Sequence, residues 1–215
     1  MEELTRFQKK VADRINDRKA VKFGTFRLKL HEKHPEAPLS PIYVTLRLPP
    51  DGPLTDEDIE DIGQAIYIIV QRSAVEFDLV GGIPRAGEPI AKVVSRLSGK
   101  PLLKLVKKIE EDRRKIDSVE GEYPVGLRVL IIDDLITQAD TKKEAIGVVE
   151  GAKLVVAAIA VLIDRQQGGT EELEKMGYKL LAVFPLDVLL NYYVTVGNIS
   201  QAKRDEVMAY VVANR

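Results

Sequence analysis

The stretch VLIIDDLITQADT, residues 129–141, decides how this chain is interpreted. Its aliphatic residues predict a buried strand that ends at Asp133 and Asp134, and the polar turn after them leads into a helix. Such a strand end projects two carboxylates from a sheet, and the helix start offers free backbone N–H groups to an anion. The simpler interpretation is that the two aspartates only end a strand and cap a helix.

Strands and helices alternate on both sides of this stretch. The hydrophobic pattern predicts strands at residues 77–83, 101–106, 128–134, 153–164 and 178–184. It predicts helices at residues 87–97, 141–152, 170–177 and 186–196. The alternation indicates an α/β fold with a parallel central sheet flanked by helices, in which a ligand binds beyond the carboxyl ends of the strands.

The N-terminal part of the chain has a different pattern. Apolar residues at helical spacing predict a helix over residues 2–18, and period-two alternation predicts paired strands at 21–30 and 40–48. A further helix follows Thr55. The segment from Asn198 onward has the spacing of a packing helix, to which we assign no chemistry.

Composition sets the limits of function. The chain has 215 residues, 45% of them hydrophobic and 30% charged, which suits one domain. A net charge of -1 does not favour a nucleic-acid partner. Without cysteine, a signal-peptide pattern or a membrane-length apolar run, we expect a soluble cytoplasmic protein with no membrane partner. His31 and His34 lie in a charged loop, so a histidine triad or a protein-built metal site is not predicted.

Two other strand ends support a binding site at the same edge. Gly81 and Gly82 open a turn that also carries Arg85, and small residues there let the backbone approach a ligand. The strand ending at Asp164 delivers Arg165 into a glycine-containing loop. Either feature alone is weak, but three such ends on one sheet edge favour a site over a simple helix cap.

Together these segments resemble the type I phosphoribosyltransferases, and within them the orotate phosphoribosyltransferases of the UMP synthase type. The resemblance covers most of the chain and follows the family's order. KFGTFRLKL with SPIYVTLR is similar to the N-terminal hood, FDLVGGIPRAGEPIAKVVS to the pyrophosphate loop, and VLIDRQQGG to the fourth conserved segment. It implies a single domain at 1–215, with a hood at roughly 1–50, a core at roughly 55–197 and a C-terminal helix at roughly 198–215.

The resemblance also implies an activity: transfer of ribose 5-phosphate from phosphoribosyl pyrophosphate to orotate, with Mg²⁺ as cofactor. Asp133 and Asp134 would hold the ribose hydroxyls and favour the cationic ring, and Arg165 would pair with the orotate carboxylate. Lys107 and Lys108 match a basic pair ahead of the family's mobile catalytic loop. The other substrate-binding residues implied are Lys29, Gly81, Gly82, Arg85, Thr137, Gln138, Ala139, Asp140 and Thr141.

The chain departs from the family where the chemistry is densest. The turn after the acidic pair lacks glycine, and Asp140 would repel a phosphate dianion there unless it points away or caps the helix. The loop KKIEEDRRKIDSVEG, residues 107–121, offers Arg113, Arg114 and Lys115 in place of the usual loop residues. These cations would close on pyrophosphate or lie in a solvated charged loop.

Two classes of function therefore stay open. The first is an orotate phosphoribosyltransferase or a relative that uses another base. The second is a protein of the same fold that binds a nucleotide or phosphoribosyl pyrophosphate without catalysis, as a regulator. Family resemblance further implies a homodimer in which the loop reaches the neighbouring active site.

Overall fold

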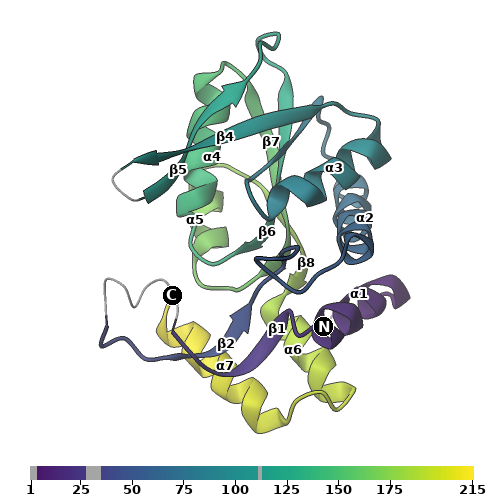
Figure 1. Cartoon of the computed structure of the whole chain (residues 1–215), viewed down its shortest axis with the longest axis vertical. Helices are drawn as coiled ribbons and strands as arrows, with labels where there is room; N and C mark the ends of the chain where they lie inside the picture. Colours follow the sequence, from purple (N-terminus) through teal and green to yellow (C-terminus); the bar gives the residue numbers. More distant parts are fainter. Residues whose placement is uncertain (1–3, 28–34, 111–112) are drawn as a thin grey trace.

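The computed structural model describes residues 4–27, 35–110 and 113–215, with backbone alone at residues 109, 110, 113 and 114. Its centre is a six-stranded sheet in the order β5-β4-β3-β6-β7-β8, in which every neighbouring pair is parallel except β4 and β5 (Figure 1). The strands are β3 (Leu79–Gly82), β4 (Leu102–Glu110), β5 (Arg113–Glu120), β6 (Arg128–Ile136), β7 (Val155–Asp164) and β8 (Leu180–Pro185). The predicted α/β fold is confirmed.

Helices cover both faces of this sheet. Leu130 and Ile132 of β6 join the core that includes α2 (Asp56–Arg72) and α3 (Gly87–Ser98). Val129 and Ile131 join the core on the other face, with α4 (Asp140–Gly151) and α5 (Gly169–Lys175). Successive strand residues point to opposite faces, so an uninterrupted aliphatic run such as VLII is needed to fill both cores.

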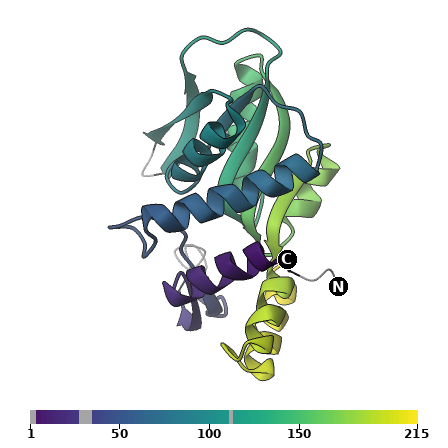
Figure 2. The ribbon, with the colours of Figure 1, turned by 90° about the vertical axis from the view of Figure 1, so that its right-hand side faces the viewer.

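The hood packs below the sheet in Figure 1, and Figure 2 shows the same layer from the side. Its strands β1 (Val21–Phe26) and β2 (Ser40–Val44) are antiparallel and pack with α1 (Arg6–Asp17). Two C-terminal helices, α6 (Leu186–Thr195) and α7 (Gln201–Ala213), complete this layer. The Tyr193 hydroxyl of α6 donates to the Ala12 carbonyl of α1, 2.9 Å away. Lys29, His31 and His34 lie outside the described residues.

Capping fixes where the first two helices begin. At α1, the Thr5 side chain accepts from the Gln8 N–H while Gln8 bonds back to the Thr5 N–H. At α2, Thr55 and Asp58 form the same reciprocal pair. Asp58 is 1% exposed, and its carboxylate also meets cations from α1, so the cap doubles as a contact between the two helices.

The prediction of a loop over residues 107–121 was wrong. Most of that stretch belongs to β4 and β5, which pair from Lys104 with Glu120 to Glu110 with Arg113. The charges hid the strand, because Ile116, which is 1% exposed, is the apolar side chain through which β5 joins the core beneath α4. A strand with so few apolar side chains lacks the period-two alternation that usually marks a strand covered on one face.

Several predicted boundaries also shift. β6 does not end at Asp133 and Asp134 but continues to Ile136, because Leu135 and Ile136 still pair with β7. β2 ends at Val44, short of the predicted residue 48, and α4 begins at Asp140. Within the described part of the chain, no helix is long and apolar enough to span a membrane.

Candidate active site

The glycine turn after β3 lies directly against β6. A Cβ added to Gly82 would come within 2.6 Å of Glu88 Cα, and one added to Gly87 would come within 2.3 Å of the Ile132 carbonyl oxygen. The Ile83 N–H donates to that same carbonyl at 2.9 Å. Only glycine fits positions 82 and 87, and the close approach brings the turn beside Asp133.

The loop after β7 joins the same edge. The Arg165 N–H donates to the Ile136 carbonyl at 2.9 Å, and the Gly169 N–H donates to the Thr137 carbonyl at 3.0 Å. A side chain at Gly169 would collide with the Thr137 carbonyl oxygen, 2.7 Å from an added Cβ. The structure thus brings together the three strand ends that the sequence singled out.

Asp133 forms a buried ion pair with Lys142. Both residues are 5% exposed, and Lys142 Nζ lies 2.6 Å from Asp133 Oδ2. The same ammonium donates to the Leu135 carbonyl at 2.6 Å, and Asp133 Oδ1 accepts from the Asp134 N–H at 2.9 Å. The carboxylate therefore has a donor on each oxygen, all from within residues 134–142.

Asp134 is electrostatically different. It is partly exposed, and Oδ1 accepts from the Leu135 N–H at 2.9 Å. Desolvation and the negative charge of Asp133 raise the pKa of Asp134 to about 7, against the opposing effect of Lys142. A carboxylate in this state gains more from a cation or hydroxyl donor than one in open water does.

The two predicted basic residues of β4 have different surroundings. Lys107 is half-buried and donates to the Pro84 carbonyl in the glycine turn. Burial lowers the pKa of Lys107, although Asp133 and Glu144 oppose that shift. Lys108 is more exposed and lies 2.8 Å from Asp117.

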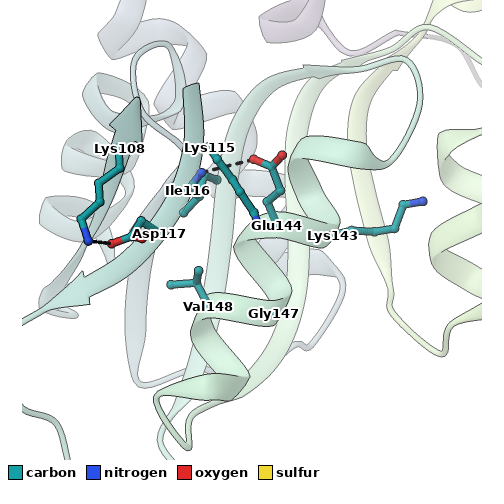
Figure 3. A pocket seen from close by; sticks show the side chains of 8 residues that line it. All are labelled: Lys108, Lys115, Ile116, Asp117, Lys143, Glu144, Gly147 and Val148. Carbon is teal, nitrogen blue, oxygen red and sulfur yellow. Dashed lines mark hydrogen bonds and ion pairs between the residues drawn. The ribbon is translucent and has the colours of Figure 1, made fainter. Parts of the chain in front are cut away.

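Lys108 lines a hollow of about 400 Å³ between the β4–β5 hairpin and α4 (Figure 3). The predicted Lys115 lines it as well, and the Glu144 side chain reaches across from α4 to accept from the Ile116 N–H at 3.2 Å. None of the acidic pair or the glycine turn borders this hollow. The side chains of Arg113 and Arg114 are outside the described atoms.

Arg85 forms an ion pair with the loop between β2 and α2. Its Nη1 lies 3.0 Å from Asp51 Oδ2, and both side chains are nearly half exposed. They border a hollow of about 160 Å³ between that loop and the glycine turn. An exposed pair of this kind is weak, so Arg85 can exchange Asp51 for an anion at little cost.

The turn from Thr137 to Thr141 forms without the glycine usual in the family. Ala139 has φ −84°, an ordinary helical value that any residue adopts, so its Cβ causes no strain. The N-cap residue Ala139 makes no side-chain cap hydrogen bond, and its own N–H donates to the Glu172 carboxylate of α5. The N–H groups of the first turn of a helix are a favourable place for an anion. Asp140 is 70% exposed and lies 3.7 Å from Lys143 Nζ, which partly offsets its charge. Gln138 is exposed and Thr141 is partly buried.

Arg165 has unmet hydrogen-bonding capacity. It is 5% exposed, yet its Nε and Nη2 atoms have no hydrogen-bond partner within the described ranges, and neither does the buried Tyr210 hydroxyl of α7. Burial lowers the pKa of Arg165, with Tyr210 acting in the opposite direction. Leaving a buried guanidinium unpaired is costly, so the site favours an oxygen-rich ligand that accepts from it.

Sequence reasoning missed Lys142. The buried residues of α4 are Lys142, Ala145, Ile146 and Val149, which are spaced as one helical face. A lysine at the first position of an apolar face, just after an acidic pair, was the available signal. A lysine in that place needs a buried counter-ion, and the acidic pair supplies the carboxylates that a strand end could bring there.

A divalent cation would find few protein ligands here. No group of three or more histidine, cysteine, aspartate or glutamate side chains in the described part could hold a metal ion. Magnesium is usually bound through one or two carboxylates together with substrate phosphates and water. The partly exposed Asp134 fits that arrangement, in which the substrate supplies most of the ligands.

Comparison with known proteins identifies the family. The model of the phosphoribosyl transferase domain matches residues 55–192, so the chain belongs to the phosphoribosyltransferases, which are enzymes. Within them it belongs to the orotate phosphoribosyltransferase family. It is 30% identical over 188 residues to the orotate phosphoribosyltransferase of Thermococcus gammatolerans, a match that covers 87% of this chain and 94% of that protein.

Solved structures agree with this assignment. Leishmania donovani UMP synthase matches with a TM-score of 0.77 and 32% identity over 96% of this chain, which spans only 42% of that longer one. Orotate phosphoribosyltransferase from Aeropyrum pernix matches with a TM-score of 0.68 over 87% of this chain and 99% of its own, and at 24% identity it supports the fold alone.

Proposed function

We propose that this protein transfers the phosphoribosyl group of phosphoribosyl pyrophosphate to a ring nitrogen of orotate, a step of pyrimidine nucleotide biosynthesis. The observation that carries the proposal is the buried Arg165, with unpartnered Nε and Nη2 atoms, one strand away from the acidic pair. A base that carries a carboxylate and exocyclic carbonyl oxygens supplies the acceptors that this guanidinium lacks.

The chain's own groups account for binding of the phosphoribosyl donor. The first turn of α4 would hold the 5'-phosphate through backbone N–H groups. The glycine turn would bring backbone N–H groups, with Arg85 and Lys107 beside it, to the pyrophosphate. As the bond between the ribose carbon and pyrophosphate breaks, positive charge grows on the ring, and the carboxylates of the acidic pair stabilise it.

Mg²⁺ completes this proposal. Bound by pyrophosphate oxygens and Asp134, the ion would supply charge neutralisation for the departing pyrophosphate. Family membership supports a homodimer and a cytoplasmic location as further parts of the proposal. Lys29 is a proposed base or donor contact on the same ground.

The test is a direct assay. The protein is incubated with orotate, phosphoribosyl pyrophosphate and Mg²⁺, and loss of orotate absorbance is followed with and without EDTA. We expect magnesium-dependent turnover that yields orotidine 5'-monophosphate and pyrophosphate in equal amounts. Turnover with uracil or a purine base, but not with orotate, would show that this other base is the substrate. Absence of turnover with every base would favour a regulatory binding protein.

Two observations weigh against the regulatory alternative. The missing glycine costs nothing, because Ala139 has an ordinary backbone conformation. The carboxylate of Asp140 is 70% exposed and lies 3.7 Å from Lys143 Nζ, which offsets part of its charge.

A further inference from the structure

We propose that the two carboxylates of the acidic pair have separate tasks in this protein. Asp134 alone contacts the ribose hydroxyls, and Asp133 is a positioning residue that Lys142 holds against the start of α4. This inference rests on the proposed function, because it names which residue of that site touches the ribose. It departs from the sequence-based expectation that both carboxylates bind ribose.

The contacts of Asp133 carry the first step. Each of its oxygens already has a charged or backbone donor at hydrogen-bond distance, and the residue is 5% exposed. A ribose hydroxyl would have to compete with the ammonium of Lys142 inside a buried pair. Breaking such a pair is strongly unfavourable, because it leaves an uncompensated buried charge.

Asp134 has the opposite properties. It is partly exposed, and the one hydrogen bond it accepts in the described structure is from the Leu135 N–H to Oδ1. Asp133 points toward α4, where Lys142 lies. Because successive residues of β6 point to opposite faces of the sheet, Asp134 points to the other face. That face is the one covered by α3, whose first residues follow the glycine turn.

Lys142 connects the acidic pair to the phosphate turn. It sits in the first turn of α4, and its ammonium donates both to Asp133 Oδ2 and to the Leu135 carbonyl, each at 2.6 Å. The Lys142 side chain thus links Asp133 and Leu135 to the first turn of α4. It therefore fixes the distance between Asp134, which contacts the ribose, and the backbone N–H groups of that turn. Asp134 binds the ribose hydroxyls and the first turn of α4 binds the phosphate of ribose 5-phosphate. Lys142 therefore sets the spacing between these two contacts.

The inference is tested with four variants and one control. They are Asp134→Asn, Asp133→Asn, Lys142→Met, the double variant Asp133→Asn with Lys142→Met, and Lys92→Met as control. Lys92 also belongs to a lysine–carboxylate pair, with Glu88, but on the exposed surface of α3. For each, thermal stability, the KM values for both substrates and the affinity for ribose 5-phosphate are measured at a temperature where every variant is folded. Binding of ribose 5-phosphate is measured by calorimetry, which needs no turnover.

We expect Asp134→Asn to weaken ribose 5-phosphate binding and to reduce kcat/KM by at least about 100-fold while stability is kept. Lys142→Met should lower the melting temperature and raise KM for phosphoribosyl pyrophosphate about tenfold, with KM for orotate unchanged. The double variant should recover most of the stability, because both members of the pair are neutral, and bind ribose 5-phosphate within about tenfold of wild type. The control should match wild type.

A double variant that binds ribose 5-phosphate as poorly as Asp134→Asn would overturn the inference, because Asp133 would then be a direct contact. Equal increases of both KM values in folded Lys142→Met would also overturn it, since that pattern indicates a general loss of structure. Failure of the proposed function has a different signature. Wild-type protein would bind ribose 5-phosphate but transfer nothing to orotate, and the binding comparison would still decide between Asp133 and Asp134.

Discussion

Buried charge occurs in two contrasting settings in this protein. Between α1 and α2, the carboxylate of Asp58 accepts from the Thr55 N–H and hydroxyl and forms ion pairs with Arg14 and Arg18. At the carboxyl edge of the sheet, Arg165 is buried with two nitrogens unpartnered in the described structure. The first setting is balanced within the chain, and the second leaves donors available for a ligand.

The same contrast appears in the pKa values. Burial would raise the pKa of Asp58, but its hydrogen bonds from Thr55 and the charges of Arg18 and Arg14 outweigh burial and lower it. At Asp134, burial and Asp133 prevail, and the pKa is raised to about 7. The α1–α2 contact therefore stabilises the fold, whereas the sheet edge gives up stability to keep groups available for a ligand.

At the sheet edge, replacement of Arg165 should have a large effect on activity. We expect Arg165→Lys to lower kcat/KM for orotate about 100-fold, since a hydrogen bond to a charged group contributes about 1.5–3 kcal/mol and lysine cannot form the bidentate contact. Steady-state kinetics with each substrate varied in turn would measure it. KM for phosphoribosyl pyrophosphate should change little, and an equal loss for both substrates would argue against a base-specific role.

Replacement of Asp58 should give the converse result. Asp58→Ala removes one half of the capping box of α2 and two ion pairs, so we expect the free energy of unfolding to fall by about 2–3 kcal/mol in urea denaturation. The stranded Arg14 and Arg18 are partly exposed and can regain water, which limits the loss. Activity at a temperature where the variant is folded should equal that of wild type. A reduced kcat in the fully folded variant would show that the α1–α2 contact also affects activity, contrary to this prediction.

The pH dependence of stability should come from the site and not from Asp58. Between the unfolded pKa near 4 and the folded value of about 7, the folded protein holds more protons at Asp134 than the unfolded chain. The stability contributed by protonated Asp134 is therefore lost as pH rises through this window. We expect a loss of about 1–2 kcal/mol, less than the full shift implies because the residue is partly exposed.

Urea denaturation of wild type and Asp134→Asn at several pH values between 4 and 8 isolates this contribution. Asparagine cannot titrate, so the curve for the variant should be flatter and should lie above that of wild type near pH 8. Parallel curves for the two proteins would mean that Asp134 titrates near its ordinary value.

Asp140→Asn should have the smallest effect. Its exposed pair with Lys143 contributes less than about 1 kcal/mol, so stability should hardly change. Removing a negative charge beside the phosphate turn should lower KM for phosphoribosyl pyrophosphate by up to about threefold, and the gain should shrink in 0.5 M salt. A higher KM in the variant would show that Asp140 takes part in binding.

The sequence predicted the helices and strands whose apolar residues form a continuous run or recur at regular spacing. The aliphatic runs of β6 and β7 and the amphipathic face of α2 are strong local signals. Strand β5 was missed because charged residues surround its buried Ile116. The end of β6 was misplaced because pairing of Ile136 with β7 is a long-range contact, which no local pattern records.

The sequence predicted which segments form the candidate site, but not which of their side chains pair with one another. Glycine turns and strand-end carboxylates point to one sheet edge by topology alone. Which carboxylate is buried depends on the register of α4 against β6, and that register brings Lys142 to Asp133. A partner nine residues away is visible in the sequence, yet its orientation is decided only by packing.

The hood has an uncommon dependence on chain order. It combines α1, β1 and β2 from the beginning of this sequence with α6 and α7 from its end, whereas β3 to β8 lie between. During synthesis the sheet can pair before α7 has left the ribosome, but the hood cannot close until then. A chain stalled before residue 201 should therefore be cut by protease in the hood while its sheet resists. The hood is then the last part of this chain to fold.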